Sequence, residues 1–69
     1  MLLLRTDVLL ERATAAGQIT SSGIAQRIGV TDSTMWRLIE GRTTPSLRTL
    51  VALRRAYEIS LDDLVREAA

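Results

Sequence analysis

The chain has 69 residues, a net charge of +1, and neither cysteine nor histidine. This length predicts one small domain over residues 1–69, and the composition excludes disulfides as well as metal sites or catalysis based on cysteine or histidine. No apolar run reaches the ~20 residues that span a bilayer, so we expect neither a membrane anchor nor a signal peptide. All nine basic residues are arginine, which can bind phosphate or guanine through two hydrogen bonds, although codon bias in a GC-rich genome explains the same composition equally well.

Residues 1–16 contain neither glycine nor proline, and they predict a first helix. Its leucines, valine and alanines form two apolar stripes, which is more hydrophobic surface than one small core needs. The helix could lie wedged between two others, or one stripe could contact a second copy of the protein. Gly17 and Gln18 end this helix, and Ile19 is expected to pack inward.

Residues 21–40 have the spacing of two short helices joined by a tight turn. Apolar residues recur on one side of each helix, at Ile24, Ala25 and Ile28 in the first and at Met35, Leu38 and Ile39 in the second. Gly29 stands where the first helix needs a left-handed residue to end, and Val30 can fill the corner between the helices. Ala25 lies where the second helix would cross, and a larger side chain there would push the helices apart. Over about residues 20–41, these features predict a helix-turn-helix motif, whose second helix enters the major groove of DNA.

Capping residues predict where the helices begin and end. Thr20 and Thr31 precede the two motif helices as N-caps, and Gly41 ends the second one. After a polar loop, Pro45 is expected to open a fourth helix with Thr44 as its cap.

Two further segments complete the predicted fold. The fourth helix turns a set of apolar residues inward, namely Leu47, Leu50, Val51, Leu53 and Tyr57. Ser60 and Asp63 have the capping-box spacing that starts a short fifth helix. Apolar residues anchor that helix, namely Leu61, Leu64 and Val65. Residues 66–69 are expected to fray. The prediction is an all-α, compact five-helix domain with the helix-turn-helix at helices 2 and 3.

The outer face of the second motif helix holds the candidates for reading DNA bases. A rotation of 100° per residue points Asp32, Ser33, Trp36 and Arg37 away from the apolar face. Arg37 is the strongest candidate because bidentate contact with guanine is the commonest specific pairing, and its alternative is a surface arginine paired with an acid. Ser33 could reach a base or a phosphate, or serve only solubility.

Asp32 and Trp36 each allow more than one interpretation. Asp32 could accept a hydrogen bond from cytosine N4, but a carboxylate also suits the positive end of a helix and is repelled by phosphates. Trp36 could press on a thymine methyl group, complete the core, or meet a partner protein.

Phosphate contacts are expected from hydroxyl and guanidinium groups around the motif, namely Ser21, Ser22, Arg27, Arg42, Thr43 and Thr44. Backbone N–H groups at the starts of both motif helices would add to them. Such contacts fix the position of a protein on DNA and carry no sequence information. Three later arginines could serve solubility or a dimer face, namely Arg48, Arg54 and Arg55.

From about residue 20 to residue 64 the chain resembles the Cro and phage-repressor type of helix-turn-helix domain, also called lambda-repressor-like. The matching features are Ala25, Gly29, Thr31, Gly41, Arg42, Pro45-Ser46-Leu47 and Ile59-Ser60-Leu61-Asp62-Asp63-Leu64. The resemblance implies a double-stranded DNA-binding transcriptional regulator, with repression as the expected effect, that acts as a homodimer on a palindromic operator. It also implies a cytoplasmic, nucleoid-associated protein of a prokaryote or phage, and a dimer contact at Leu61, Leu64 and Val65, with the first helix as the competing surface.

Two other classes of function compete with DNA binding. A protein-interaction module could keep the same fold and dock a protein through Trp36, and the faint net charge favours that alternative. An enzyme is not expected, because nothing resembles an activated nucleophile and five short helices leave little room for a pocket. We expect no cofactor, metal or small-molecule ligand.

Overall fold

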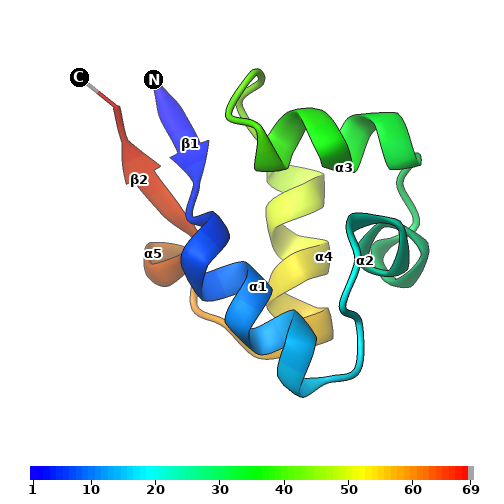
Figure 1. Cartoon of the computed structure of the whole chain (residues 1–69). Coiled ribbons are helices and arrows are strands. Elements are labelled where there is room, and N and C mark those ends of the chain that lie inside the picture. The colour runs from blue at the N-terminus through cyan, green and yellow to red at the C-terminus, as the bar shows by residue number, and fades with distance from the viewer. Residues whose placement is uncertain (69) are drawn as a thin grey trace.

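A computed structural model describes residues 1–68, and Ala69 lies outside the described residues. The elements follow in the order β1 (Leu2–Leu4), α1 (Thr6–Ala15), α2 (Ser21–Ile28), α3 (Asp32–Ile39), α4 (Leu47–Tyr57), α5 (Leu61–Leu64) and β2 (Val65–Glu67). Figure 1 shows α4 behind the other helices, with α1 in front of it, α3 across its upper end, and α2 to one side. The predicted all-α, compact five-helix fold is confirmed, with one short pair of strands added to it. None of the helices formed by residues 1–68 has the length and apolar character that crossing a bilayer requires.

The prediction of a helix from residue 1 is wrong at its start. Leu2–Leu4 form a strand that pairs antiparallel with Val65–Glu67, with Leu3 opposite Arg66. The two chain ends therefore lie side by side (Figure 1). Leucine favours a helix in isolation, but here the distant C-terminal segment offers backbone hydrogen-bond partners that hold the first residues extended.

The same pairing contradicts the expected fraying of the C-terminus at Arg66 and Glu67. Besides the strand ladder, the Ala68 N–H donates to the Met1 carbonyl oxygen at 2.9 Å. The Arg5 N–H donates to the Leu64 carbonyl oxygen at 2.7 Å, which joins the start of α1 to the end of α5. Of residues 66–69, only Ala69 lies outside the described part of the chain.

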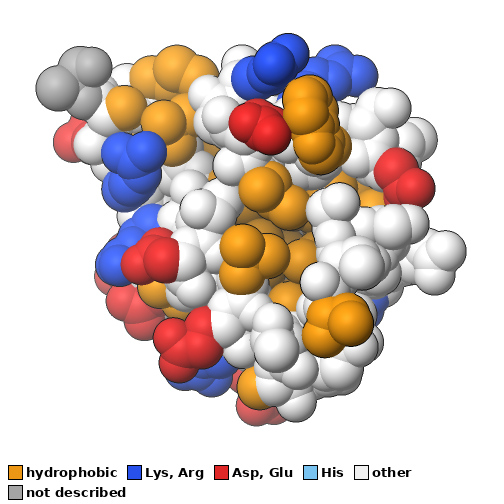
Figure 2. Space-filling model, viewed as in Figure 1, with side chains coloured by type: hydrophobic (Ala, Val, Ile, Leu, Met, Phe, Trp, Pro, Cys, Tyr) orange, Lys and Arg blue, Asp and Glu red, His pale blue; other side chains and the backbone are white. Residues whose placement is uncertain are grey.

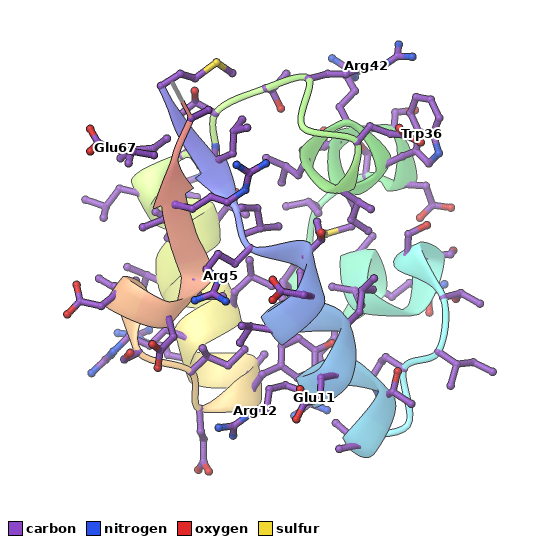
Figure 3. All side chains as sticks on the ribbon, turned by 60° about the vertical axis from the view of Figure 1, so that its left-hand side comes forward. Arg5, Glu11, Arg12, Trp36, Arg42 and Glu67 are labelled. Carbon is purple, nitrogen blue, oxygen red and sulfur yellow. The ribbon has the colours of Figure 1, made fainter. Side chains whose placement is uncertain are left out.

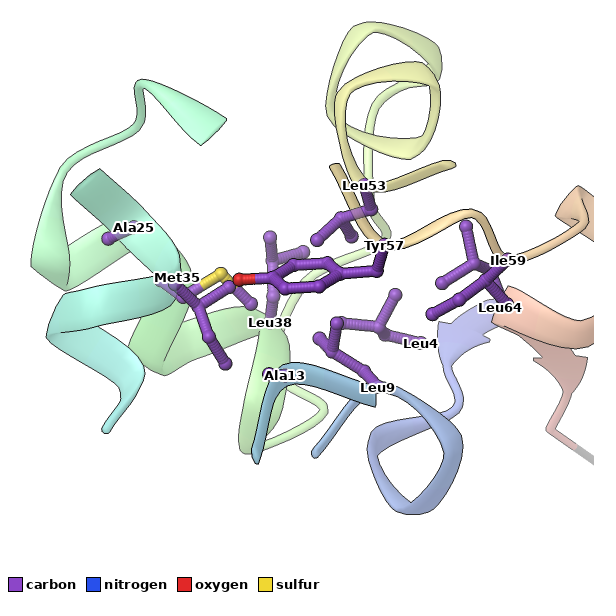
Figure 4. Close-up of a cluster of buried hydrophobic side chains, with 11 residues drawn as sticks. Leu4, Leu9, Ala13, Ala25, Met35, Leu38, Leu53, Tyr57, Ile59 and Leu64 are labelled. Carbon is purple, nitrogen blue, oxygen red and sulfur yellow. The ribbon is translucent and has the colours of Figure 1, made fainter. Parts of the chain in front are cut away.

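The core collects apolar side chains from every helix and from β1. Its buried members are Leu4, Leu9, Ala13, Ile24, Ala25, Met35, Leu38, Leu53, Tyr57, Ile59 and Leu64. Figure 4 shows the ring of Tyr57 lying among them, with Leu53 on one side and Leu9 and Ala13 on the other. The apolar face of each motif helix is thus buried in this core, which leaves the opposite faces to solvent.

Two predicted inward residues are instead exposed. Ile19 is 79% exposed, because the turn between α1 and α2 draws in its neighbour Gln18, whose amide oxygen accepts hydrogen bonds from Arg27 and Tyr57, both at 3.1 Å. Leu47 is 70% exposed, because it lies with Val51 and Arg55 on the outer side of α4, whereas other residues of that helix face the core.

Most predicted helix ends are confirmed. The side chains of Thr20, Thr31 and Ser60 accept backbone N–H groups at the starts of α2, α3 and α5. The cap of α4 differs, because Ser46 accepts from the Thr49 N–H at 3.2 Å. Pro45 therefore precedes the cap and is buried, instead of occupying the first helical position.

Candidate nucleic-acid interface

The helices α2 and α3 form the predicted motif. Gly29 ends α2 with φ of +78°, a left-handed conformation that glycine adopts without steric cost, and the chain turns there toward α3. Ala25 is fully buried and Val30 is half-buried, in agreement with the roles that their spacing predicted. Because Met35 and Leu38 are buried on the inner side of α3, the outer side of that helix forms part of the protein surface.

All four predicted base-reading residues are exposed on α3: Asp32, Ser33, Trp36 and Arg37. Residues four positions apart are neighbours on a helix surface, so Asp32 with Trp36 and Ser33 with Arg37 form two adjacent rows. These four residues, together with Ser21 and Arg42, line a shallow open hollow of about 470 Å³. The structure therefore brings the first residue of α2, the outer face of α3 and the loop after α3 to one site.

Ser22 and Asp32 link the starts of the two motif helices. The Ser22 hydroxyl donates to the Asp32 carboxylate at 3.0 Å. This bond occupies the hydroxyl proton of Ser22, whereas Ser21 lines the hollow itself. The backbone N–H groups in the first turns of both helices have no acceptor within their own helices and carry partial positive charge, which suits an anion.

Arg42 reaches the hollow because of the turn that ends α3. Gly41 has φ of +73°, its N–H donates to the Leu38 carbonyl oxygen at 3.2 Å, and the Arg42 N–H donates to the Arg37 carbonyl oxygen at 3.0 Å. This pair of bonds is the Schellman motif. The turn directs the Arg42 side chain over the Trp36 ring, with the guanidinium carbon 4.9 Å from the ring centroid, and Figure 3 shows the two side chains together at the outer end of the molecule.

Charges of both signs lie around the hollow. In Figure 2, basic side chains lie at the edge formed by α3 and the loop that follows it, with an acidic side chain beside them, and further basic side chains lie among the acidic ones over the rest of this face. On the side of the hollow, the positive charges of Arg37 and Arg42 are thus balanced by the negative charges of Asp32 and Glu40, and the charges are arranged locally without a net basic excess. No group of three or more acidic side chains among residues 1–68 is placed to hold a metal ion.

The sequence matches the model of the helix-turn-helix domain family over residues 8–68. The chain belongs to this family. Membership points to a DNA-binding regulator in general terms, which agrees with the exposed outer face of α3. No curated protein matches the chain at a significant level.

In this helix-turn-helix domain, Arg27 lies apart from the hollow. Its guanidinium donates to Gln18 Oε1 at 3.1 Å and to the Ala56 carbonyl oxygen at 2.8 Å, and its guanidinium carbon lies 5.0 Å from the Tyr57 ring centroid. It projects about 120° away from Ser21 around α2. Arg27 therefore joins α2 to α4 within the protein, a contact that residue spacing alone did not indicate.

The remaining predicted site residues are divided between the surface and the interior. Thr43 is half-buried and Thr44 is exposed in the loop after α3. Of the three residues expected at a dimer contact, Leu61 is 37% exposed and Val65 is half-buried, whereas Leu64 is fully buried in the core. Leu64 has no exposed surface to offer to a second copy.

Proposed function

We propose that this protein is a sequence-specific transcriptional regulator of the Cro and phage-repressor type, which inserts α3 into the major groove of double-stranded DNA. The observation that carries the proposal is the hollow in which the exposed outer face of α3 meets Ser21 and Arg42. Base-reading groups on one helix, flanked by groups that suit phosphate, are the arrangement that a helix-turn-helix needs on a duplex.

The chemistry of each side chain in the hollow suggests which part of the DNA it contacts. Arg37 donates two hydrogen bonds to a guanine, and Ser33 at the start of α3 reaches a base edge or a phosphate. Asp32 accepts from a cytosine or adenine amino group. Phosphates are bound by Ser21, Arg42 and the backbone N–H groups that begin α2 and α3, with Thr43 and Thr44 on the adjoining loop. Ser22 joins them only by exchanging its bond to Asp32.

A dimer on a two-fold operator completes the proposal. One module of this size covers roughly 600–1,000 Å² of protein surface on DNA, at the low end for specific binding. Two copies that place their α3 helices ~34 Å apart would read half-sites one helical turn apart. Leu61 and Val65 are the surface residues that we propose for the contact between copies, and repression follows if the operator overlaps a promoter.

Selection from random duplexes with the purified full chain tests this proposal. We expect enrichment of a palindromic site whose half-sites are about 10 base pairs apart, centre to centre, bound by two copies and weakened steeply by salt. Failure to enrich any site at low salt would contradict the proposal. Capture of a defined protein partner, together with that failure, would favour a protein-interaction module.

A further inference from the structure

We infer that Trp36, held in place by Arg42, reads a thymine methyl group in the major groove. This inference rests on the proposed function and names one base that the hollow selects. Trp36 is a large aromatic side chain, 46% exposed, on the otherwise polar outer face of α3. Trp36 therefore does not complete the core, which the other side of α3 already fills with Met35 and Leu38.

The Trp36 ring has a charged neighbour on the protein, Arg42. The Arg42 guanidinium carbon lies 4.9 Å from the indole centroid, within the range of a cation–π contact. The backbone of Arg42 is held by its bond to the Arg37 carbonyl oxygen and by the left-handed turn at Gly41. Leu3 of β1 lies beside that turn, 3.9 Å from where a Cβ of Gly41 would stand. The contact with Arg42 therefore favours one orientation of the indole before DNA arrives, which reduces the entropy cost of binding.

The chemistry of base edges decides what such a ring can recognise. In the major groove, the apolar group that a base presents is the C5 methyl of thymine, whereas guanine, adenine and cytosine present polar donors and acceptors at their edges. Trp36 shares a row with Asp32 and adjoins Arg37, so the ring faces the same groove as the hydrogen-bonding residues. The Arg42 guanidinium that lies over the ring can also bind the phosphate beside that base. This phosphate contact would bring the thymine methyl group against the indole.

Thymine-to-uracil replacement tests this inference without altering the protein, because uracil differs from thymine only by the missing methyl group. In the selected site, each thymine is replaced in turn by uracil, and affinity is measured with the full chain. We expect one thymine in each half-site whose replacement weakens binding about fourfold, the effect of one buried methyl group. A duplex with cytosine at that position should also bind the protein more weakly, and a duplex with 5-methylcytosine there should recover part of the lost affinity.

Variants identify the side chain responsible. The Trp36→Ala variant should bind the thymine and uracil sites with equal affinity. In the Arg42→Ala variant, the preference for thymine should fall together with the affinity for every sequence. Leu47→Ala removes an exposed apolar side chain outside the hollow and should keep the fourfold preference. Because Trp36 is the single tryptophan, its fluorescence should change on binding the thymine site more than the uracil site.

The failure of the inference differs from the failure of the proposed function. A selected site that binds tightly but shows no thymine-to-uracil effect, or that contains no thymine, overturns the reading by Trp36 and leaves DNA binding intact. The same holds if Trp36→Ala keeps the full preference. Absence of any selected site overturns both, and capture of a protein by wild type but not by Trp36→Ala would then assign the ring to a protein partner.

Discussion

The hydroxyl of Ser22 donates to the carboxylate of Asp32 at 3.0 Å, and this bond joins the first turn of α2 to the first turn of α3. It fixes a negative charge at the edge of the surface that we propose for DNA. A carboxylate there is repelled by phosphates on any sequence, but it can accept from an amino group on the right base. The Ser22–Asp32 pair would therefore improve discrimination between DNA sequences more than it improves the affinity for DNA.

Replacement of Asp32 by asparagine tests this role. Asparagine keeps the size and an oxygen acceptor for Ser22, but it removes the charge. We expect affinity for a scrambled duplex to rise about fivefold, since one unit charge at ~4 Å in water is worth ~1 kcal/mol, while the preference for the selected site falls. Fluorescence anisotropy on the two duplexes at the same salt concentration measures both.

Asp62→Asn is the matched control for this charge change. Asp62 is exposed on α5, which Figure 1 shows well away from α3. Its removal should leave both affinities within about twofold, because charges beyond ~10 Å are screened by salt. Equal effects of the two variants would mean that only net charge matters and that Asp32 has no local role.

The pairing of β1 with β2 predicts a stability effect at Leu4. This residue is 3% exposed and enters the core from the strand. Leu4→Ala should lower the free energy of unfolding by about 2–4 kcal/mol, a large fraction of the total for a domain of this length. Leu2→Ala, at a position 43% exposed in the same strand, should cost much less. Urea unfolding followed by circular dichroism compares them, and equal losses would contradict the buried position of Leu4.

The buried phenol of Tyr57 predicts a loss of stability at alkaline pH. Burial raises its pKa above the ordinary value of 10.0, although the nearby Arg27 charge opposes the shift. An acid with a raised pKa in the folded state contributes its full stability below pH 10.0, and that contribution is lost as the pH rises through the folded-state pKa.

Tyr57→Phe provides the comparison. It loses the hydrogen bond to Gln18, so at neutral pH it should be less stable by about 1 kcal/mol. Above pH 10, the free energy of unfolding of Tyr57→Phe should fall less steeply with pH than that of the wild type. Because Tyr57 is the single tyrosine, tyrosinate absorbance reports its ionisation directly. If the free energy of unfolding depends on pH in the same way for the two proteins, the raised pKa of Tyr57 would be contradicted.

Local signals in the sequence predicted the motif well. Gly29 and Gly41 take the left-handed conformations expected of them, and Thr20, Thr31 and Ser60 accept the predicted backbone bonds. These features depend on residues within a few positions of one another, so a single helix turn is enough to determine them. The outer face of α3 followed directly from the same periodicity.

Contacts between distant segments were not predictable in this way. The strand at Leu2–Leu4 depends on Val65–Glu67 at the other end of the chain, and leucine alone favours a helix there. The engagement of Arg27 with Tyr57 requires α2 and α4 to be placed in space. The stacking of Arg42 on Trp36 was missed for the same reason, although Gly41 after α3 signals the turn that allows it.

The most direct test compares Arg37→Ala with Arg55→Ala on the selected site and on a scrambled duplex. Both arginines are exposed, but Arg37 lines the hollow and Arg55 lies on α4 outside it. We predict that Arg37→Ala loses about 10- to 100-fold in affinity for the selected site and little on the scrambled duplex, whereas Arg55→Ala changes neither appreciably. Unchanged binding of the selected site by Arg37→Ala, or an equal loss on both duplexes, would contradict the reading of DNA by α3.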